Sequence, residues 1–342
     1  MSLNEQWPSQ SRNWESRMSE KLLSVVIPTY NMEAYLRRCL DSVTRDDVPS
    51  SLELIVVNDG STDGSLAIMQ EYATKRPDIV NIIDKPNGHY GSCVNAALKA
   101  ATGKYFRILD ADDWFDTDGL IKLLNELENI SADIIVTPYK KIRRTKTIEY
   151  KPKQVSYNQA YNLSQESIWT NQDFELFVMH SMTFRTSVLR DVKLHLSEGI
   201  CYTDNEFLIY PTKAAKSIIF LESLLYNYDM TREGQSMDSA IQVKNCGHLA
   251  TIIRRFAERI DKLDRFSGRF CSRVLVSYYY RRLFACIDDN ELKEIDRLIQ
   301  TSAPFLFKNV DVALLHAPSL WRKFGLHFLF YEKLKRFFNI DR

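Results

Sequence analysis

Short apolar runs alternate with stretches of helical periodicity through residues 22–137, and this alternation constrains the fold more than any other feature of the sequence. The runs, which are rich in β-branched residues, predict buried strands at 22–27, 52–57, 79–83, 105–109 and 133–137. The stretches between them predict helices at 32–43, 65–75, 91–101 and 120–130. Strands that alternate with helices across short loops indicate an α/β fold with a mainly parallel sheet flanked by helices.

Polar residues follow three of the predicted strands at the point where each strand ends. Pro28 is expected to end the first strand and opens the segment 28–31, residues 58–60 follow the second strand, and residues 110–113 follow the fourth. Ligands bind at the carboxyl ends of the strands in open parallel sheets. The shared location of the three segments therefore indicates a binding site more strongly than any one of them alone.

The acidic segment 110–113 (Asp-Ala-Asp-Asp) is suited to hold a divalent cation against a diphosphate. Mg²⁺ and Mn²⁺ take oxygen ligands and often use one or two protein carboxylates beside phosphate and water. Alternate residues of an extended segment face the same way, so we expect Asp110 and Asp112 to reach one ligand while Asp113 turns aside. The alternative, which the isolated motif favours, is a solvated loop in which Asp113 or Asp116 caps the next helix.

Two further segments have both a structural and a functional interpretation. Residues 58–60 (Asn-Asp-Gly) are typical of a turn, yet Asp59 is also placed to accept hydrogen bonds from a nucleobase or ribose. Residues 87–91 (Asn-Gly-His-Tyr-Gly) precede a helix, where glycines let main-chain N–H groups approach a phosphate. Their spacing fits neither a P-loop nor a complete G-x-G-x-x-G motif.

Together these segments resemble glycosyltransferase family 2, whose members have the Rossmann-like GT-A fold. The segments 24–31, 56–63, 87–97 and 109–113 carry the resemblance, in the family's order and at its usual intervals. The resemblance is specific over residues 22–137 and looser to about residue 240. It implies an inverting transferase that uses a nucleotide-diphosphate sugar, usually a UDP-sugar, together with Mg²⁺ or Mn²⁺.

The resemblance also implies a role for each matching residue. The positions that match donor-binding positions of the family are Pro28, Thr29, Glu33, Asp59, Asn87, Gly88, Asn95, Asp110 and Asp113. Asp59 matches the acid that hydrogen-bonds the base, usually uracil. Asp112 matches the principal metal ligand, and Asp110 lies beside it toward the ribose or sugar. Many members carry an arginine where this chain has Val94, so the donor contacts of that helix differ here.

A direct displacement needs a general base for the acceptor hydroxyl, and the second half of the chain is expected to supply it. Residues 198–207 resemble a family segment that often carries a Glu-Asp pair, with Thr203 in place of the glutamate. We therefore assign Asp204 as the catalytic base and keep Glu206 as the second candidate for that role. Asp204 is also able to cap the helix that follows, and the two roles are compatible.

Three other residues are weaker candidates for the site. Residues 226–236 resemble the loop that covers the donor, where Arg232 is expected to neutralise the leaving diphosphate unless it is an exposed loop arginine. His180 precedes residues 183–185, a strand-like segment that resembles the acceptor-side wall. A lone histidine is more often structural, and we interpret His180 and His89 in that way first.

The chain is expected to divide into an arm, a catalytic domain and an extension. The expected parts are a polar arm at 1–20, a GT-A catalytic domain at 21–240 (donor-binding half 21–137, acceptor side 138–240) and a helical C-terminal extension at 241–342. Within the acceptor side, the basic residues of 140–153 suggest an exposed hairpin.

Composition narrows the partners and the compartment. The net charge of +1 gives no reason to expect a nucleic-acid partner, and six cysteines without a CxxC pair indicate neither a zinc site nor a redox motif. No run approaches the roughly 18 apolar residues of a membrane span, so we expect a cytoplasmic protein. Aromatic and basic residues mix in 321–338. A helix with this mixture either packs on the catalytic domain, which is the interpretation we favour, or lies on the anionic inner face of a membrane.

The sequence thus predicts a transferase that moves a sugar from a nucleotide-diphosphate donor to a hydroxyl of a glycan or lipid-linked glycan, as in bacterial-type surface polysaccharide synthesis. The alternatives are a non-catalytic relative that binds a nucleotide-sugar or a glycan, and a sugar nucleotidyltransferase. The intact acidic segment argues against the first alternative. Residues 28–31 do not provide the Gly-rich loop with a following basic residue that the second needs.

Overall fold

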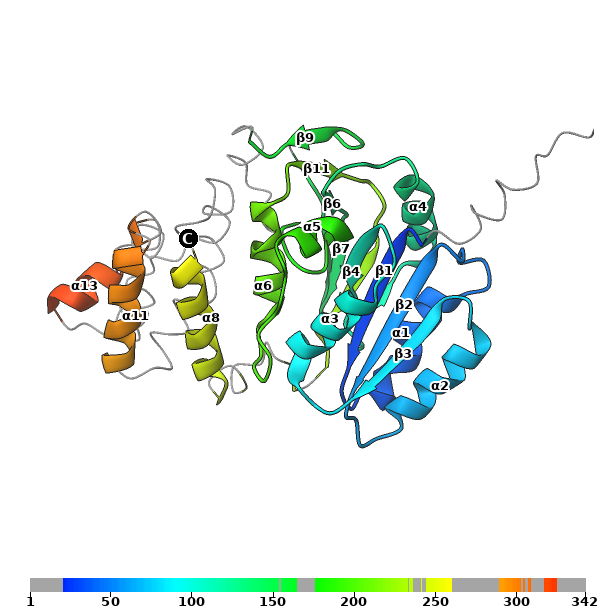
Figure 1. The fold of residues 1–342 in the computed structure, drawn as a ribbon, viewed down its shortest axis with the longest axis horizontal. Helices are drawn as coiled ribbons and strands as arrows, with labels where there is room; N and C mark the ends of the chain where they lie inside the picture. The colour runs from blue at the N-terminus through cyan, green and yellow to red at the C-terminus, as the bar shows by residue number, and fades with distance from the viewer. Residues whose placement is uncertain are drawn as a thin grey trace, which may run out of the picture.

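The computed structural model describes residues 21–153, 155–164, 176–232, 234–235, 241, 244–259, 289–302, 304, 307–308 and 317–324. Two sheets form the centre of the molecule, helices cover them, and the C-terminal helices stand in a row beyond α6 (Figure 1). The predicted arm at 1–20 and most of the aromatic and basic segment 321–338 lie outside the described residues.

The larger sheet has eight strands in the spatial order β3-β2-β1-β4-β10-β6-β11-β9. Neighbours from β3 to β4 are parallel, β10 is antiparallel to β4 and β6, β11 is parallel to β6, and β9 is antiparallel to β11. The bounds are β1 Leu23–Thr29, β2 Leu52–Asp59, β3 Val80–Lys85, β4 Tyr105–Ile108, β6 Ile134–Val136, β9 Ala160–Asn162, β10 Met182–Arg185 and β11 Ser217–Phe220. The predicted mainly parallel sheet is confirmed.

β1 continues through Pro28, so the prediction that Pro28 ends the strand is wrong. Val26 accepts a hydrogen bond from Leu109 N at 2.9 Å, and the even-numbered residues of β1 therefore face β4. β4 ends at Ile108, so the N–H that Pro28 lacks would point beyond the end of that strand. Proline is tolerated here because no ladder hydrogen bond is lost.

Four helices connect the strands of the predicted donor half. They are α1 Glu33–Thr44, α2 Ser65–Lys75, α3 His89–Ala100 and α4 Thr117–Leu127, each within three residues of the predicted bounds. In α4 the buried side chains recur at i, i+3, i+4 and i+7, as expected of a helix with one apolar face: Leu120, Leu123, Leu124 and Leu127. α3 packs over β2 and β1, while α1 lies against α2 and α4.

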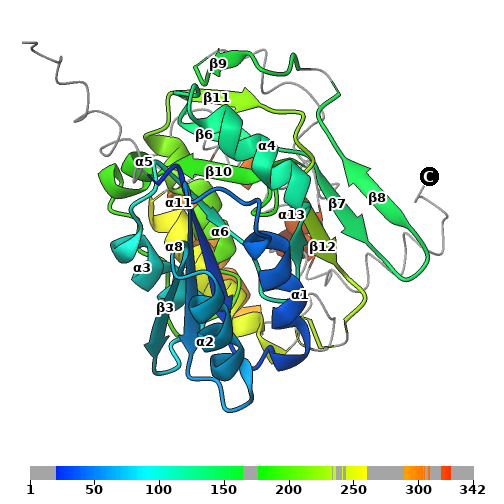
Figure 2. The same ribbon diagram turned by 90° about the vertical axis from the view of Figure 1, so that its right-hand side faces the viewer.

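The smaller sheet has the order β5-β12-β7-β8, and Figure 2 shows it on the side of α1 away from β3. Its strands are β5 Trp114–Phe115, β7 Tyr139–Ile142, β8 Thr147–Tyr150 and β12 Tyr226–Asp229. β7 and β8 are antiparallel neighbours, which confirms the predicted hairpin within 140–153. Because β12 pairs with β5, it lies directly beside the acidic segment that precedes β5.

Two short helices and the C-terminal helices complete the described fold. They are α5 Thr186–Asp191, α6 Asp204–Ile209, α8 Cys246–Arg259, α11 Asp289–Ser302 and α13 Ala317–Phe324, and Pro211–Lys213 forms a 3₁₀ turn after α6. Phe207 fixes α6 to the large sheet, with ring centroids 6.1 Å from Phe106 and 5.2 Å from Phe184. α8 packs beside α6, where the Phe256 and Tyr210 rings lie 5.7 Å apart. No helix among the described residues is both long and apolar enough to span a membrane.

Candidate active site

The parallel register brings the predicted strand ends to one edge of the large sheet. Thr29 at the end of β1 is the register partner of Asn58 in β2, and Asp59 is the partner of Lys85 in β3. The acidic segment follows β4, which is the other neighbour of β1. The three polar segments identified in the sequence therefore lie next to one another.

Asp110 is half-buried, Asp113 is buried, and tyrosine hydroxyls hold both carboxylates. Tyr90 Oη donates to Asp110 Oδ1 at 3.0 Å, and Tyr226 Oη donates to Asp113 Oδ2 at 2.7 Å. Asp229 N donates to the other oxygen of Asp113 at 2.7 Å. Both oxygens of Asp113 are thus occupied within the fold. Asp113 N also donates to Asp110 O at 3.0 Å, so the segment forms a turn in which the Asp113 carboxylate stays close to that of Asp110.

The crowding of these carboxylates suits a cation. Burial, and then the charge of Asp112, raises the pKa of Asp110 to about 8, and burial also raises the pKa of Asp113 far above its ordinary value. Ligand atoms of Asp110, Asp113 and His180 lie within 4.8 Å of one another. Burial lowers the pKa of His180 to about 3, so its imidazole stays neutral and keeps a lone pair for a metal. Oxygen donors with one neutral imidazole fit a divalent ion.

Asp112, the predicted metal ligand, is paired with Arg232, the residue predicted to contact the diphosphate. Arg232 Nε lies 2.8 Å from Asp112 Oδ2. Arg38 braces the same region, because its Nη2 donates to Asp112 O at 2.6 Å and to Asp229 Oδ2 at 2.9 Å. The guanidinium of Arg232 thus occupies one carboxylate oxygen of Asp112 in this structure.

Asp59 is buried at the end of β2 and accepts two hydrogen bonds on one oxygen. Lys85 Nζ and Gly88 N both donate to Asp59 Oδ1, the latter at 2.9 Å. Gly60 follows with φ of +72°, and a Cβ there would lie 2.9 Å from Asn87 N. A side chain at position 60 would therefore both strain the turn and push the loop at residue 87 away from Asp59.

The remaining predicted donor residues lie around these strand ends. Thr29 is buried and its hydroxyl donates to Ile27 O at 3.1 Å, while Pro28 is half-buried. Glu33 is exposed and accepts a hydrogen bond from Gly64 N at 2.8 Å, which ties α1 to the start of α2. Asn87 is exposed beside Gly88.

Asn95 is buried in α3 and uses its amide to hold the chain on the acceptor side. Its Nδ2 donates to Leu196 O and to Glu198 Oε1, each at 2.9 Å, and its Oδ1 accepts from Leu196 N at 2.8 Å. These bonds place Asn95 as a link between the donor helix and the segment before Asp204. Val94 beside it is completely buried.

Asp204 is the first residue of α6. Its charge contributes to the raised pKa values of both Tyr90 and Asp110, so Asp204 lies in the vicinity of the acidic segment. Burial raises the pKa of Asp204 itself to about 6. No side chain caps the start of α6. Glu206 is fully buried and accepts from Ser197 N at 2.6 Å and Ser197 Oγ at 2.8 Å, which commits it to the fold.

Several residues of the site were not assigned a role from the sequence. Tyr90, Tyr226 and Lys85 contact the predicted carboxylates, yet tyrosine and lysine near strand ends are too common to be a signal. Arg107 is different, because a cation inside an apolar strand is unusual. It is completely buried, burial lowers its pKa to about 9, and it donates to Thr183 Oγ1 at 2.7 Å and to His180 O.

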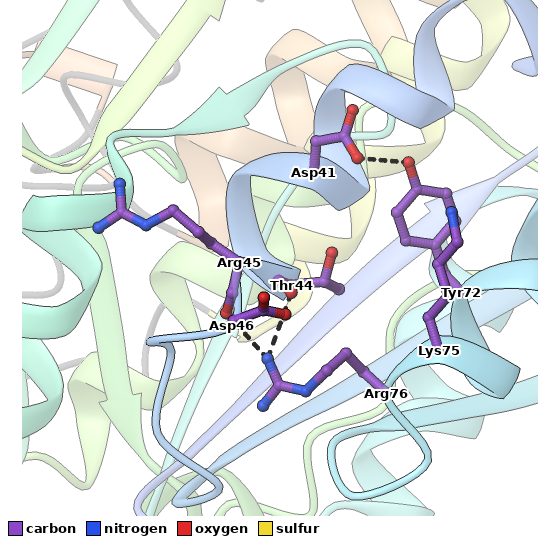
Figure 3. Close-up of a pocket in the computed structure, with 7 residues that line it drawn as sticks. All are labelled: Asp41, Thr44, Arg45, Asp46, Tyr72, Lys75 and Arg76. Atoms are coloured by element: carbon purple, nitrogen blue, oxygen red, sulfur yellow. Dashed lines mark hydrogen bonds between the residues drawn. The ribbon is translucent and has the colours of Figure 1, made fainter.

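A pocket of about 470 Å³ lies away from this site, between the C-terminal ends of α1 and α2 (Figure 3). Its polar groups already contact one another, since Tyr72 donates to Asp41 at 2.5 Å and Arg76 donates to Thr44 O at 3.2 Å. Helices of this fold end near the amino ends of the following strands. The pocket therefore lies at the sheet edge opposite the carboxylates and is a contact between two helices rather than a ligand site.

Residues 24–193 match the sequence model described as "Glycosyl transferase family 2". The chain belongs to glycosyltransferase family 2. The family 2 match covers all four motif segments and ends before Asp204 and Arg232. It favours the glycosyltransferase prediction over the nucleotidyltransferase alternative.

Two relatives from bacteria illustrate this family 2 membership. The chain is 28% identical over 214 residues to the glycosyltransferase EpsJ of Bacillus subtilis, which covers 60% of each chain. It is 27% identical over 221 residues to the poly(ribitol-phosphate) beta-N-acetylglucosaminyltransferase TarS of Staphylococcus aureus, which covers 64% of this chain and 37% of TarS. The match thus spans less than two thirds of either relative.

The solved structures support the fold. A crystal structure of a TarS fragment from S. aureus in complex with UDP-GlcNAc superposes with a TM-score of 0.64 at 21% identity, over 85% of this chain and 83% of that one. The predicted GT-A fold is confirmed by this likeness and by the mainly parallel sheet.

Proposed function

We propose that this protein transfers a sugar from a UDP-sugar to a hydroxyl of a glycan or lipid-linked glycan, with inversion at the anomeric carbon. The similarity to TarS supports the donor and acceptor classes, since TarS is a poly(ribitol-phosphate) beta-N-acetylglucosaminyltransferase and was crystallised with UDP-GlcNAc. EpsJ carries the general name of a glycosyltransferase.

In this proposal the donor lies along the carboxyl edge of the large sheet. The nucleobase end is bound near Asp59, Thr29 and Pro28, and the diphosphate end lies near Asp110 and Asp112. Arg232 is paired with Asp112 of the acidic segment in this structure. In the proposal, a change of its side-chain conformation releases Asp112 and brings the guanidinium to the diphosphate. A charge-assisted hydrogen bond from Arg232 then stabilises the leaving group.

A divalent cation, Mg²⁺ or Mn²⁺, would be held by Asp112 and Asp110. His180 would add a ligand from the side of Asp110, to which a ring nitrogen lies within 4.8 Å. When bound, such an ion offsets the charge that builds up on the diphosphate. The carboxylates fit this role, because burial and then the charge of Asp112 disfavour the ionised form of Asp110, and a bound cation would offset both effects.

Asp204 takes the proton in the transfer step. The acceptor oxygen forms a bond to the anomeric carbon, the bond from that carbon to the diphosphate oxygen breaks, UDP leaves, and the acceptor proton moves to Asp204. One observation supports this assignment most strongly. The charge of Asp204 is close enough to Tyr90 and Asp110 to raise their pKa values, and its own pKa of about 6 makes it a stronger base than an exposed aspartate while it remains ionised at pH 7.

The test measures UDP release with a panel of UDP-sugars and Mn²⁺, together with UDP binding by calorimetry. We expect the wild-type protein to bind UDP and to hydrolyse one UDP-sugar slowly, which forms free UDP. The Asp204→Asn variant should bind UDP with similar affinity but form no UDP from that donor. Binding without release in the wild type would instead support a non-catalytic nucleotide-sugar binder. If the Asp204→Asn variant turns over normally, Asp204 is not the base.

From the sequence we predict a cytoplasmic location for the protein. We also propose that its C-terminal helices contact a membrane. Lipid-linked acceptors would be reached from a membrane surface, and the mixed basic and aromatic residues of 321–338 are compatible with that. Sedimentation with anionic vesicles tests the contact directly.

A further inference from the structure

Lys85 forms an ion pair with Asp59, the residue proposed to contact the nucleobase. The two residues are register partners on the adjacent parallel strands β3 and β2, at the carboxyl edge of the sheet. The Asp59 side chain is 4% exposed and that of Lys85 is 20% exposed. A lysine side chain is seldom this enclosed unless specific groups accept hydrogen bonds from its ammonium.

All three donors of the Lys85 ammonium are used within the protein. Nζ donates to Asp59 Oδ1, to Pro86 O at 2.8 Å and to Ser92 Oγ at 2.8 Å. An ammonium has three N–H donors and no acceptor, so none remains for a phosphate or a base. Lys85 therefore acts through the groups that it holds rather than as a ligand of the nucleotide.

These bonds fix one oxygen of Asp59 and leave the other for a ligand. Gly88 N also donates to Oδ1, at 2.9 Å, so two protein donors converge on that atom. Oδ2 receives no N–H or O–H donor from the part of the chain that the structure describes. The Cys93 thiol also contacts the Asp59 carboxylate as a weak S–H donor. It brings no charge, because burial, with the charge of Asp59 second, raises its pKa to about 12.

We propose that Lys85 is a positioning residue that orients Asp59 so that Oδ2 accepts the imide N3–H of uracil, and that it thereby sets the preference for a uracil nucleotide. Uracil presents one N–H between two carbonyl groups, which a fixed carboxylate oxygen can accept. Cytosine has an unprotonated N3 at the same position. This nitrogen is an acceptor, so it would face the carboxylate with no hydrogen bond between them. The inference rests on the proposed use of a UDP-sugar and names the residue that determines the base.

The experiment compares the binding of UDP with that of N3-methyl-UDP, which lacks the N3–H donor, by calorimetry on the full chain. We expect the wild type to bind UDP at least about tenfold more tightly than N3-methyl-UDP, the size of effect that one hydrogen bond to a charged group gives. In Lys85→Met that ratio should fall to about threefold or less, because Asp59 is no longer fixed. Lys85→Arg should restore most of it.

Lys75→Met is the matched control, since Lys75 is an exposed lysine in α2 paired with Glu71, at the opposite edge of the sheet. It should keep the wild-type ratio. Melting temperatures without ligand report whether Lys85→Met folds. If it does not, Lys85→Gln, which keeps an N–H donor without the charge, is measured instead and should show an intermediate ratio.

Three outcomes would overturn the inference. An unchanged ratio in a folded Lys85→Met or Lys85→Gln protein would show that Lys85 only stabilises the loop. Equal binding of UDP and N3-methyl-UDP by the wild type would mean that the imide is not recognised, while UDP binding itself still supports the proposed donor. Failure of the wild type to bind either compound would refute the proposed function as well.

Discussion

Replacing Asp204 with asparagine is expected to stabilise the fold above pH 6 while it stops sugar transfer. Burial raises the pKa of Asp204 from 3.8 to about 6, so the native state binds the proton more tightly than the unfolded chain does. The stabilising contribution of the protonated side chain is fully present below pH 3.8 and is lost as pH rises to about 6. Above pH 6 the half-buried carboxylate of Asp204 lowers the free energy of unfolding, and a neutral amide of the same shape removes that cost.

The magnitude follows from the size of the shift. About two pKa units correspond to about 3 kcal/mol of unfolding free energy at pH 8. Asn205 Nδ2 donates to Asp204 Oδ1 at 3.1 Å, and that bond is weaker when the acceptor is neutral, so we expect a net gain of about 1–2 kcal/mol. For a chain of 342 residues the gain corresponds to a rise in Tm of about 1–3 °C at pH 8. At pH 4 the native Asp204 is protonated, and the gain should be small.

The assay is chemical denaturation of wild type and variant at pH 4 and pH 8, with UDP release from the donor measured on the same samples. Loss of a general base should lower the transfer rate by about 10²–10⁴-fold. The matched control is Asp191→Asn, an exposed aspartate at the end of α5, which should change neither quantity. A stability gain of equal size at both pH values, or no gain at pH 8, would refute the burial argument even if activity were lost.

The donor half of the fold was predictable because its signals are local. Apolar runs, helical spacing and the polar residues at strand ends all lie within a few residues of the structure they determine, and the observed bounds follow them closely. Pro28 was the exception, since its tolerance within β1 depends on where the neighbouring strand β4 ends. That end is set by the pairing of strands distant in sequence, which a proline in one strand does not reveal.

The carboxylates of the site were visible in the sequence, but their partners were not. Asp113 is held by Tyr226 and by the main chain of Asp229, more than 110 positions away, so its burial could not be inferred from the acidic segment alone. The partners became neighbours through the pairing of β12 with β5. The sequence also assigned Asp112 to a metal and Arg232 to the diphosphate separately, whereas the structure pairs the two side chains.

Three further substitutions test the contacts around the acidic segment and the C-terminal helices. Asp112→Asn should abolish the dependence of UDP binding on Mn²⁺, measured by calorimetry with and without the ion, since it removes one of the ligand carboxylates. Arg232→Gln should lower kcat/KM by about 10–100-fold, as expected for one charge-assisted hydrogen bond to the diphosphate, and an unchanged value would place the arginine outside the reaction. Arg255→Met should destabilise the protein by about 1–2 kcal/mol and also lower kcat. Arg255 reaches from α8 to Ser197 Oγ and lies 3.7 Å from the fully buried Glu206, two residues after Asp204, so its loss leaves that carboxylate without its cation and loosens the helix that carries the base. Chemical denaturation and donor turnover measure the two effects, and a loss of stability with unchanged kcat would show that α8 supports the fold without positioning Asp204.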